Sequence, residues 1–463
     1  MDGALHQVSE NPRDDLNKFY DSGVTKSYAF RVEQLNKLRN ALAKYENEIA
    51  GALTTDLKKS PEESYATETG LVIAEVNLAL KKLRKWMRPK RVPTNLVNIP
   101  SASYIYRDPL GVVFIIAPWN YPFQLLFLPL IGAIAGGNCV VLKPSELAPA
   151  TAALSEKIIR EIYPEDYIRV IQGEGADVVP ATIRSIHFDH IFYTGSIPVG
   201  KSVYQLAASK LIPVTLELGG KSPAIVEQDA NLRIAARRIA LGKFINAGQS
   251  CVAPDYLLIH ESVKNPFIAF LKESIQEFFG SDPATSENFG KIINRKRFNK
   301  LVSYLSMGNI LTGGQFDEQK MFVAPTIMDG VDLNSALMAE EIFGPVLPVF
   351  TFTEMAEAFA IVQRQANPLS FYLFTADKNK EKSWIESLPF GGGCINNTAW
   401  QFVNNHLPFG GIGASGIGAY HGKYSFEVFT HAKPVMKTPT WIDPSIKYPP
   451  FKGKMKWFKR FIR

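Results

Sequence analysis

The sequence predicts an α/β fold with parallel sheets in more than one domain. From Gly111 onward, apolar segments of strand length alternate with segments of helical periodicity. This alternation is typical of a parallel sheet covered by helices. Polar and Gly-rich segments follow several of the strands, at the edge where such sheets bind ligands. Because 463 residues exceed one ordinary hydrophobic core, we expect at least two domains.

The N-terminal part is predicted to be a helical scaffold. Residues 14–50 carry apolar side chains at helical spacing, such as Leu35 and Leu42, and predict one long amphipathic helix. Residues 67–84 continue the helical pattern, and residues 101–107 resemble a strand.

Two series of strands and helices follow. The first has expected strands at residues 112–117, 139–142, 168–171, 191–193 and 214–218, with helices at 123–137 and 149–163. The second has expected strands at residues 256–259, 346–352 and 370–375, with helices at 265–279, 296–305 and 355–362. We therefore expect a pocket between two α/β domains.

Polar or flexible residues stand at the ends of strands in the first series. Asn120 follows the first strand, Lys143 the second and Gly195 a later one, while Glu217 lies in the last. The carboxyl ends of parallel strands meet at one edge of a sheet, so these residues are expected to surround one ligand.

The segment Phe244–Cys251 ends a predicted helix, and Gly248 is expected to break that helix. A turn of small residues would expose the thiol of Cys251 to a substrate and direct backbone N–H groups toward a developing negative charge. The alternative is a buried structural thiol, because free cysteine is among the most buried residue types. The residue pattern around the thiol leaves both interpretations open.

Glu217 stands between two leucines and is followed by Gly219 and Gly220. A carboxylate at the end of an apolar run is either ion-paired or poised as a base with a raised pKa.

Gly195, Ser196 and Gly200 form a loose glycine motif rather than G-x-G-x-x-G. Gly195 would permit close backbone approach, and Ser196 would begin a helix whose N-terminus favours a pyrophosphate. An ordinary helix cap is the alternative.

Lys143 and Glu146 lie three positions apart after a strand, where a solvated ion pair is the default interpretation.

Together these segments resemble motifs of the aldehyde dehydrogenase superfamily, in the family's order from about residue 20 to 430. The motifs are Pro118–Phe123, Lys143–Glu146, Phe192–Ser196, Leu216–Pro223, Phe244–Cys251, Glu340–Pro345 and Pro408–Gly411. Residues 413–426 are most similar to the class-three branch, and residues 443–450 to its fatty aldehyde dehydrogenases, although the hydrophobic membrane anchor of the latter is missing.

The resemblance implies NAD(P)-dependent oxidation of aromatic or medium- to long-chain aliphatic aldehydes to carboxylic acids through a thiohemiacetal and a thioester. It implies Cys251 as nucleophile, Glu217 as activator of the hydrolytic water and Asn120 as oxyanion donor. The implied cofactor-binding residues are Trp119, Lys143, Glu146, Gly195, Ser196, Gly200, Glu341 and Phe343. NAD or NADP would serve, and Glu146 favours NAD because a carboxylate repels a 2′-phosphate.

Other functions are less consistent with the sequence. Acyl transfer to coenzyme A needs no hydrolytic base, so Glu217 argues against it. A catalytically inactive cofactor-binding or structural member of the fold would be expected to lack Cys251, Glu217 or Asn120, and all are present. His406 and His421 are expected in structural hydrogen bonds. No Cys or His spacing indicates a metal site.

The composition is that of an ordinary globular protein, with 46% apolar and 21% charged residues. No uncharged apolar segment is long enough to span a membrane, and Met1–Asp15 does not resemble a signal peptide. Three cysteines in so long a chain indicate a reducing compartment, and we expect a cytoplasmic protein.

The positive charge is concentrated at the C-terminus. Seven of the 51 Lys and Arg residues lie in residues 447–463, which contain no acid, so the rest of the chain balances 44 basic against 44 acidic residues. Aromatic and basic residues interleave in residues 451–463, which would suit peripheral contact with an anionic membrane. A tail docked across a dimer or left in solvent is the alternative, and no motif supports nucleic-acid binding.

These observations and the resemblance give a domain scheme. It consists of a Rossmann-type NAD(P)-binding domain (residues 1–97 and 108–217), a catalytic domain (218–396), a small β oligomerisation arm (98–107 and 397–430) that pairs with another subunit in a homodimer, and a basic tail (431–463).

Overall fold

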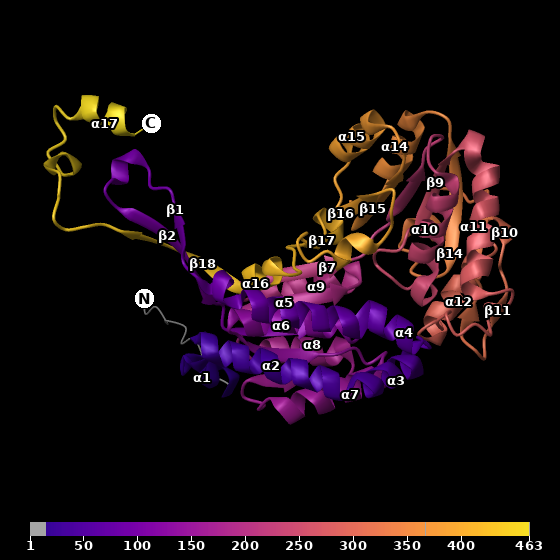
Figure 1. Ribbon diagram of the computed structural model, residues 1–463, viewed down its shortest axis with the longest axis horizontal. Helices are drawn as coiled ribbons and strands as arrows, with labels where there is room; N and C mark the ends of the chain where they lie inside the picture. The colour runs from indigo at the N-terminus through magenta and orange to yellow at the C-terminus, as the bar shows by residue number, and fades with distance from the viewer. Residues whose placement is uncertain (1–14, 366, 463) are drawn as a thin grey trace, which may run out of the picture.

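The computed structural model describes residues 15–365 and 367–462 and consists of two α/β domains and a projecting β arm (Figure 1). Apart from Asp15, the predicted polar N-terminus lies outside these residues. The two domains have separate hydrophobic cores, one built mainly from residues 16–218 and the other from residues 224–388.

The predicted single helix over residues 14–50 is wrong, because the segment forms three α-helices. These are α1 (Asp15–Asp21), α2 (Tyr28–Lys44) and α3 (Glu46–Leu57). Gly23 takes a left-handed conformation with φ 77°, and the side chain of Ser27 then caps α2 by accepting the N–H of Phe30. Periodicity of the apolar residues continued across these breaks, because all three helices pack on the same core.

Short helical elements follow α3. They are α4 (Pro61–Ser64), a π-helical turn (Tyr65–Thr69) and α5 (Gly70–Met87). The helix predicted over residues 67–84 is confirmed from Gly70 onward, while its first three residues belong to the π-helical turn.

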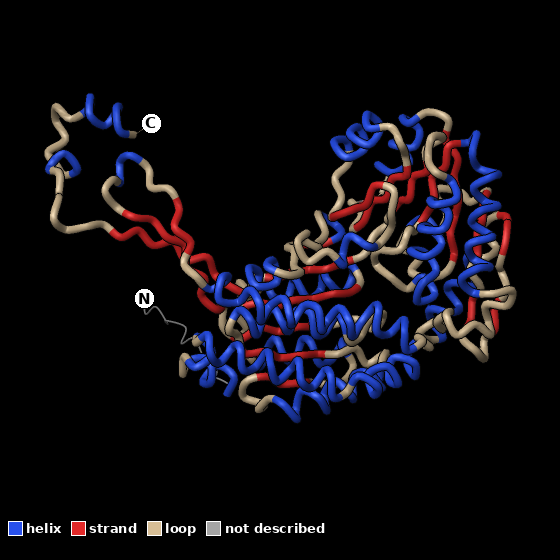
Figure 2. Tube along the Cα trace, viewed as in Figure 1, coloured by secondary structure: helices blue, strands red, loops and turns tan. Residues whose placement is uncertain are grey.

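The first sheet has the predicted parallel strands. They are β3 (Val112–Ile116), β4 (Cys139–Lys143), β5 (Ile168–Val170), β6 (His190–Gly195) and β7 (Val214–Leu218), in the order β7-β6-β3-β4-β5. The helices α6 (Gln124–Gly136), α7 (Pro149–Ile162), α8 (Gly175–Ser185) and α9 (Ile197–Ala208) connect them (Figure 2). This is the dinucleotide-binding strand order, and its ligand crevice lies where the order reverses, beyond the carboxyl ends of β3 and β6.

The second sheet contains the predicted strands β9 (Tyr256–His260), β14 (Val346–Phe352) and β15 (Ser370–Phe374). The sequence did not predict β8 (Pro223–Val226), β10 (Asn309–Thr312), β13 (Thr326–Asp329) and β16 (Gly392–Ile395), nor the hairpin β11 (Phe316–Asp317) and β12 (Phe322–Val323). The helices of the second domain are α10 (Leu232–Phe244), α11 (Lys264–Phe279), α12 (Arg295–Tyr304), α13 (Ala336–Ala339), α14 (Met355–Gln363) and α15 (Lys378–Ser387). The sheet order is β10-β13-β14-β9-β8-β15-β16.

The arm is a three-stranded sheet of β1 (Lys90–Val92), β2 (Ala102–Pro109) and β18 (Thr430–Lys437). The expected arm segment 397–430 therefore differs from the structure, in which the third strand begins at Thr430. Before that point, β17 (Gly416–Ile417) pairs with β7, and α16 (Lys423–Val428) packs on α6. Tyr420 and Phe429 belong to the first core, because apolar side chains keep this segment on the body.

The tail continues beyond the arm and ends in the short helix α17 (Met455–Phe461), beside the arm in Figure 1. Within the described ranges, no helix is long and apolar enough to cross a membrane.

Glu75 of α5 gives a pH-dependent contribution to stability. Its carboxylate is buried and accepts the N–H of Gly422 at 2.7 Å. Burial raises the pKa of Glu75 to about 7, although hydrogen bonds from Gly422 and Ser425 oppose that rise. The protonated carboxyl of Glu75 therefore makes its full contribution to folding stability below pH 4.5, the ordinary pKa. That contribution is lost as the pH rises through 7, where the carboxyl ionises in the folded protein.

We expect Glu75→Gln, which keeps an acceptor without a charge, to become more stable than the wild type as the pH rises from 5 to 9. Over this range the free energy of unfolding of the variant should rise relative to that of the wild type by at most about 3 kcal/mol. Thermal unfolding across this pH range measures it, with Glu287→Gln, at an exposed loop position, as the control. A stability difference independent of pH would contradict the assignment.

Candidate active site

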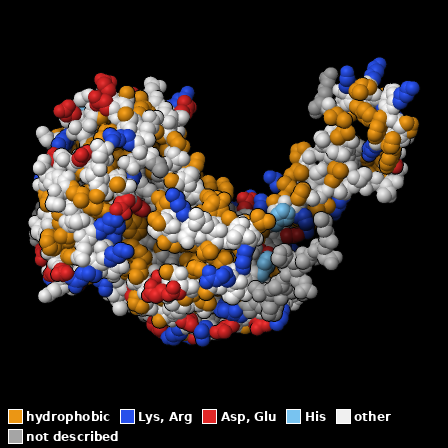
Figure 3. Space-filling view, turned by 180° about the vertical axis from the view of Figure 1, so that it is seen from behind, with side chains coloured by type: hydrophobic (Ala, Val, Ile, Leu, Met, Phe, Trp, Pro, Cys, Tyr) orange, Lys and Arg blue, Asp and Glu red, His pale blue; other side chains and the backbone are white. Residues whose placement is uncertain are grey.

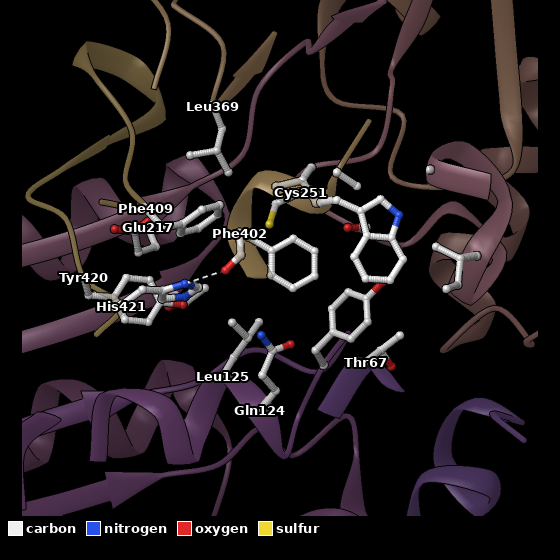
Figure 4. Close-up of a pocket in the computed structure, with 18 of the residues that line it drawn as sticks. Thr67, Gln124, Leu125, Glu217, Cys251, Leu369, Phe402, Phe409, Tyr420 and His421 are labelled. Carbon is white, nitrogen blue, oxygen red and sulfur yellow. Dashed lines mark hydrogen bonds between the residues drawn. The ribbon is translucent and has the colours of Figure 1, made fainter. Parts of the chain in front are cut away.

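A cavity lies between the two domains (Figure 4). Both domains contribute to its lining, which is largely apolar and includes Cys251, Glu217 and His421. The other lining residues are Ala66, Thr67, Tyr121, Gln124, Leu125, Thr194, Leu218, Leu241, Gly242, Ile245, Ser250, Val252, Leu369, Ala399, Trp400, Phe402, Phe409 and Tyr420.

Cys251 follows α10 and a tight turn. Asn246 and Ala247 have left-handed φ values of 51° and 52°, and Gly248 has φ 73°. A Cβ on Gly248 would lie 2.4 Å from the carbonyl oxygen of Gly344, so only glycine fits there. The thiol is partly exposed and its sulfur points into the cavity, which decides against a sealed structural thiol.

The electrostatic surroundings oppose ionisation of this thiol. Burial raises the pKa of Cys251 well above its ordinary value, and the carboxylates of Glu341 and Glu217 add to that effect.

Glu217 lies on β7 and is 3% exposed. Among the described residues, neither of its carboxyl oxygens has a hydrogen-bond partner. Burial therefore raises the pKa of Glu217 well above its ordinary value. Of the two interpretations that the sequence left open, the structure favours the base over the ion pair.

Asn120 lies in the loop after β3 and is almost completely buried. Its side-chain amide donates to the carbonyl oxygen of Gln249 at 3.1 Å, two residues before Cys251. Asn246 donates from its side chain to the carbonyl oxygens of Asn120 at 2.8 Å and Gln249 at 3.2 Å. These hydrogen bonds hold the Asn120 loop against the segment that ends at Cys251, whereas Asn120 itself is not among the residues that line the cavity.

Lys143 and Glu146 form a close ion pair at the carboxyl end of β4. The N–H of Gly175 donates to Glu146 at 3.2 Å, at the start of α8. Partial burial would raise the pKa of Glu146, but the hydrogen bond from Lys143 and those from backbone N–H groups outweigh it, so the pKa is lowered. Sequence reasoning missed Gly175, which carries no side chain that could signal its position.

The helix α9 begins at the carboxyl end of β6, beside the crevice. Ser196 is its N-cap, but the Ser196 side chain makes no capping hydrogen bond, which leaves the N-terminal N–H groups available to an anion. A Cβ on Gly195 would lie 2.3 Å from the hydroxyl oxygen of Tyr193, and one on Gly200 would lie 2.6 Å from Leu218. Gly200 therefore allows α9 to pack closely on β7. These features fit a dinucleotide cofactor.

Trp119 and Phe343 come from different domains and meet edge to face, with ring centroids 5.3 Å apart. Glu341 approaches the backbone of Gly219, where a Cβ would lie 1.8 Å from its carboxylate. Burial raises the pKa of Glu341 well above its ordinary value, with a further contribution from Asp255. The predicted cofactor residues of the second domain therefore face the first domain.

Two further charged residues hold the segment of Glu341. The guanidinium of Arg297 donates to the carbonyl oxygens of Glu341 and Phe343, each at 3.4 Å, and Asp255 accepts the N–H of Ile342 at 2.9 Å. Sequence reasoning missed both, because a charged residue on a helix or after a loop usually faces solvent.

His421 lines the cavity, and its Nδ1 makes a 2.8 Å hydrogen bond with the carbonyl oxygen of Phe402. Burial lowers the pKa of His421 to about 4, so the ring is neutral near pH 7. The expected structural hydrogen bond is confirmed for this residue. His406 is exposed and lies outside the cavity lining.

The dinucleotide-binding strand order of the first sheet and an interdomain cavity lined by Cys251 and Glu217 are features of a nucleotide-dependent oxidoreductase. The chain belongs to the aldehyde dehydrogenase family, whose model matches residues 24–435. It is therefore an NAD(P)-dependent aldehyde dehydrogenase.

The chain matches relatives over nearly its whole length and nearly the whole of theirs. It is 47% identical to the 4,4'-diaponeurosporen-aldehyde dehydrogenase of Staphylococcus aureus, over 97% of this chain and 98% of that protein. It is 40% identical to aldehyde dehydrogenase family 3 member H1 of Arabidopsis thaliana, over 97% of this chain and 93% of that protein. A solved structure of the substrate-bound state of S. aureus AldH superimposes with a TM-score of 0.95, at 47% identity and over 97% and 98% of the two chains. The expected class-three resemblance is confirmed.

We expect catalytic turnover to increase as the pH rises from 6 to 9. In the roles that the sequence leads us to expect, nucleophile and base, Cys251 and Glu217 must each lose a proton, and burial raises the pKa of each. Steady-state rates at saturating aldehyde and cofactor measure this dependence. Rates that stayed constant or fell over this range would contradict the assigned roles.

Proposed function

We propose that this enzyme oxidises apolar aldehydes, aromatic or medium- to long-chain aliphatic, to carboxylic acids. The observation that carries this proposal is the composition of the cavity, in which Cys251 and Glu217 share a lining of mostly apolar side chains. Phe402 and Phe409 border the space beside the sulfur (Figure 4) and would pack on a hydrocarbon chain or a ring.

In the proposed mechanism, the Cys251 thiolate attacks the aldehyde carbon. A C–S bond forms while the carbonyl π electrons move to oxygen. The side-chain amide of Asn120 and a backbone N–H near Cys251 donate to this oxyanion, and loss of such a donor typically costs about 10² to 10³ in rate. NAD or NADP, when bound, accepts the hydride that leaves as the C=O bond forms again. Glu217 then takes a proton from the water that hydrolyses the thioester, which releases the acid and the thiolate.

The cofactor roles are also proposals. Lys143 and Glu146 would bind ribose hydroxyls, and the start of α9 would bind the pyrophosphate. Gly195, Ser196 and Gly200 shape that turn, Glu341 would bind the nicotinamide ribose, and Trp119 and Phe343 would lie near the ring. The free N-terminus of α9 supports the pyrophosphate role. The carboxylate of Glu146 favours NAD over NADP, since it would repel a 2′-phosphate.

We propose further that the enzyme is a cytoplasmic homodimer whose arm pairs with a second subunit. The arm projects from the body, with β1 and β18 as its edge strands. Unpaired edge strands form hydrogen bonds readily with another chain. A relative from Canis lupus familiaris is named a dimeric, NADP-preferring aldehyde dehydrogenase. The free state of all three cysteines fits a reducing compartment.

The tail is proposed to contact anionic membrane surfaces. In and next to α17, exposed Met455, Trp457 and Ile462 alternate with Lys and Arg residues. Hydrophobic and basic side chains gather at the end of the arm (Figure 3). Each basic residue near an anionic bilayer contributes about 1 kcal/mol.

Cys251→Ala is expected to abolish aldehyde oxidation. Glu217→Gln is expected to form one equivalent of NADH per site and then stall, because thioester hydrolysis loses its base. Stopped-flow absorbance at the NADH band measures both, with Cys394→Ser, a thiol outside the cavity lining, as the control. Full steady-state turnover by Glu217→Gln would refute the assignment of the base.

Deletion of residues 451–463 is expected to abolish co-sedimentation with phosphatidylserine vesicles while benzaldehyde oxidation continues. Binding of the full chain should weaken as salt increases and should be absent with phosphatidylcholine alone. If the deletion left sedimentation unchanged, the tail would not be the membrane contact.

A further inference from the structure

A fully buried ion pair lies behind the loop that carries Asn120. The Lys59 Nζ and a Glu68 carboxyl oxygen are 2.5 Å apart, and both side chains have no exposed surface. The two residues flank α4, and Glu68 lies in the π-helical turn Tyr65–Thr69. Such turns are rare and are frequent at functional sites. Here the turn points Glu68 inward while the neighbouring Thr67 lines the cavity.

The pair holds the Asn120 loop at the carbonyl group of Asn120 and where the loop enters α6. Lys59 donates to the carbonyl oxygen of Asn120 at 3.1 Å. The second carboxyl oxygen of Glu68 accepts the N–H groups of Phe123 at 2.9 Å and Gln124 at 3.1 Å. The loop is therefore fixed from the carbonyl group of Asn120 to the first residue of α6 by charge-assisted hydrogen bonds.

The same segment also reaches the nucleophile loop. Glu63, between the two charged residues, accepts the N–H of Asn246 at 3.1 Å. The side chain of Asn246 donates to the carbonyl oxygen of Asn120, which thus receives hydrogen bonds from both Lys59 and Asn246. Residues 59–68 consequently place Asn120 and the Cys251 loop relative to one another.

Stability alone does not account for this pair. A buried ion pair contributes little net stability, because desolvation of both charges offsets their attraction. An oxyanion donor, in contrast, is effective only when its position is fixed before the reaction. A misplacement of about 1 Å can cost 10²-fold in rate.

We propose that Lys59 and Glu68 are positioning residues that act through Asn120, and that they hold its side-chain amide where the oxyanion forms. The proposal rests on the oxyanion role proposed for Asn120. Neither residue touches the substrate in this arrangement; each fixes a peptide group of the loop.

The test compares the double variant Lys59→Met/Glu68→Gln with the wild type. Removal of both charges avoids an unpaired buried ion, so the variant is expected to stay folded. We expect the single-turnover rate of NADH formation to fall by about 10- to 100-fold, within the loss typical of a missing oxyanion donor. The KM for NAD should stay within twofold. The pair Lys380→Met/Glu227→Gln removes another ion pair of the second domain, outside the cavity lining, and should leave the rate unchanged.

A double-mutant cycle separates positioning from a general structural effect. Added to Asn120→Ala, the change Lys59→Met/Glu68→Gln should lower the rate by less than twofold further. An equal loss in both backgrounds, or no loss in the wild-type background, would overturn the proposal. If Asn120→Ala alone kept the full rate, the proposed oxyanion role would fail first, and the positioning role with it.

If Lys59→Met/Glu68→Gln did not fold, Lys59→Arg/Glu68→Asp provides the second variant. It keeps both charges but moves both hydrogen-bonding groups relative to the loop. We expect an intermediate loss of rate that again disappears in the Asn120→Ala background. Retention of the full rate with the shifted pair would count against positioning.

Discussion

The hydrogen bonds between Asn120 and the loop before Cys251 are the contacts on which the active site depends. They join the carboxyl end of β3 in one domain to the end of α10 in the other. Because each domain has its own core, contacts of this kind are needed to fix the distance between Asn120 and Cys251. The edge-to-face rings of Trp119 and Phe343 make a second contact across the same cleft.

Desolvation is the second physical constraint. The cavity removes Glu217 from water and supplies no hydrogen-bond partner among the described residues, which favours its neutral form. The same burial opposes ionisation of Cys251. A buried, largely apolar pocket therefore suits an apolar aldehyde and strengthens every hydrogen bond to a developing oxyanion, but it makes proton removal from both groups difficult.

The errors in the sequence-based prediction have local physical causes. Apolar periodicity predicted one helix over residues 14–50, because the helices α1, α2 and α3 all present apolar faces to one core. The short strands β8 and β16 lack alternation, and the arm was expected over residues 397–430 although its third strand, β18, begins only at Thr430. Lys59, Glu68 and Arg297 were missed because a charged residue in a helical stretch is usually solvated.

The sequence by itself indicated the α/β class, the strands of the first sheet and the motifs that contain Cys251, Glu217 and Asn120. Hydrophobic periodicity and motifs are local properties of the chain, so they can be read without the fold. Only the tertiary structure decided that Glu217 is unpaired, that Cys251 faces a cavity, and that a buried ion pair holds Asn120. Burial and partner choice arise from residues far apart in the chain, such as Lys59 and Asn120, and no local pattern encodes them.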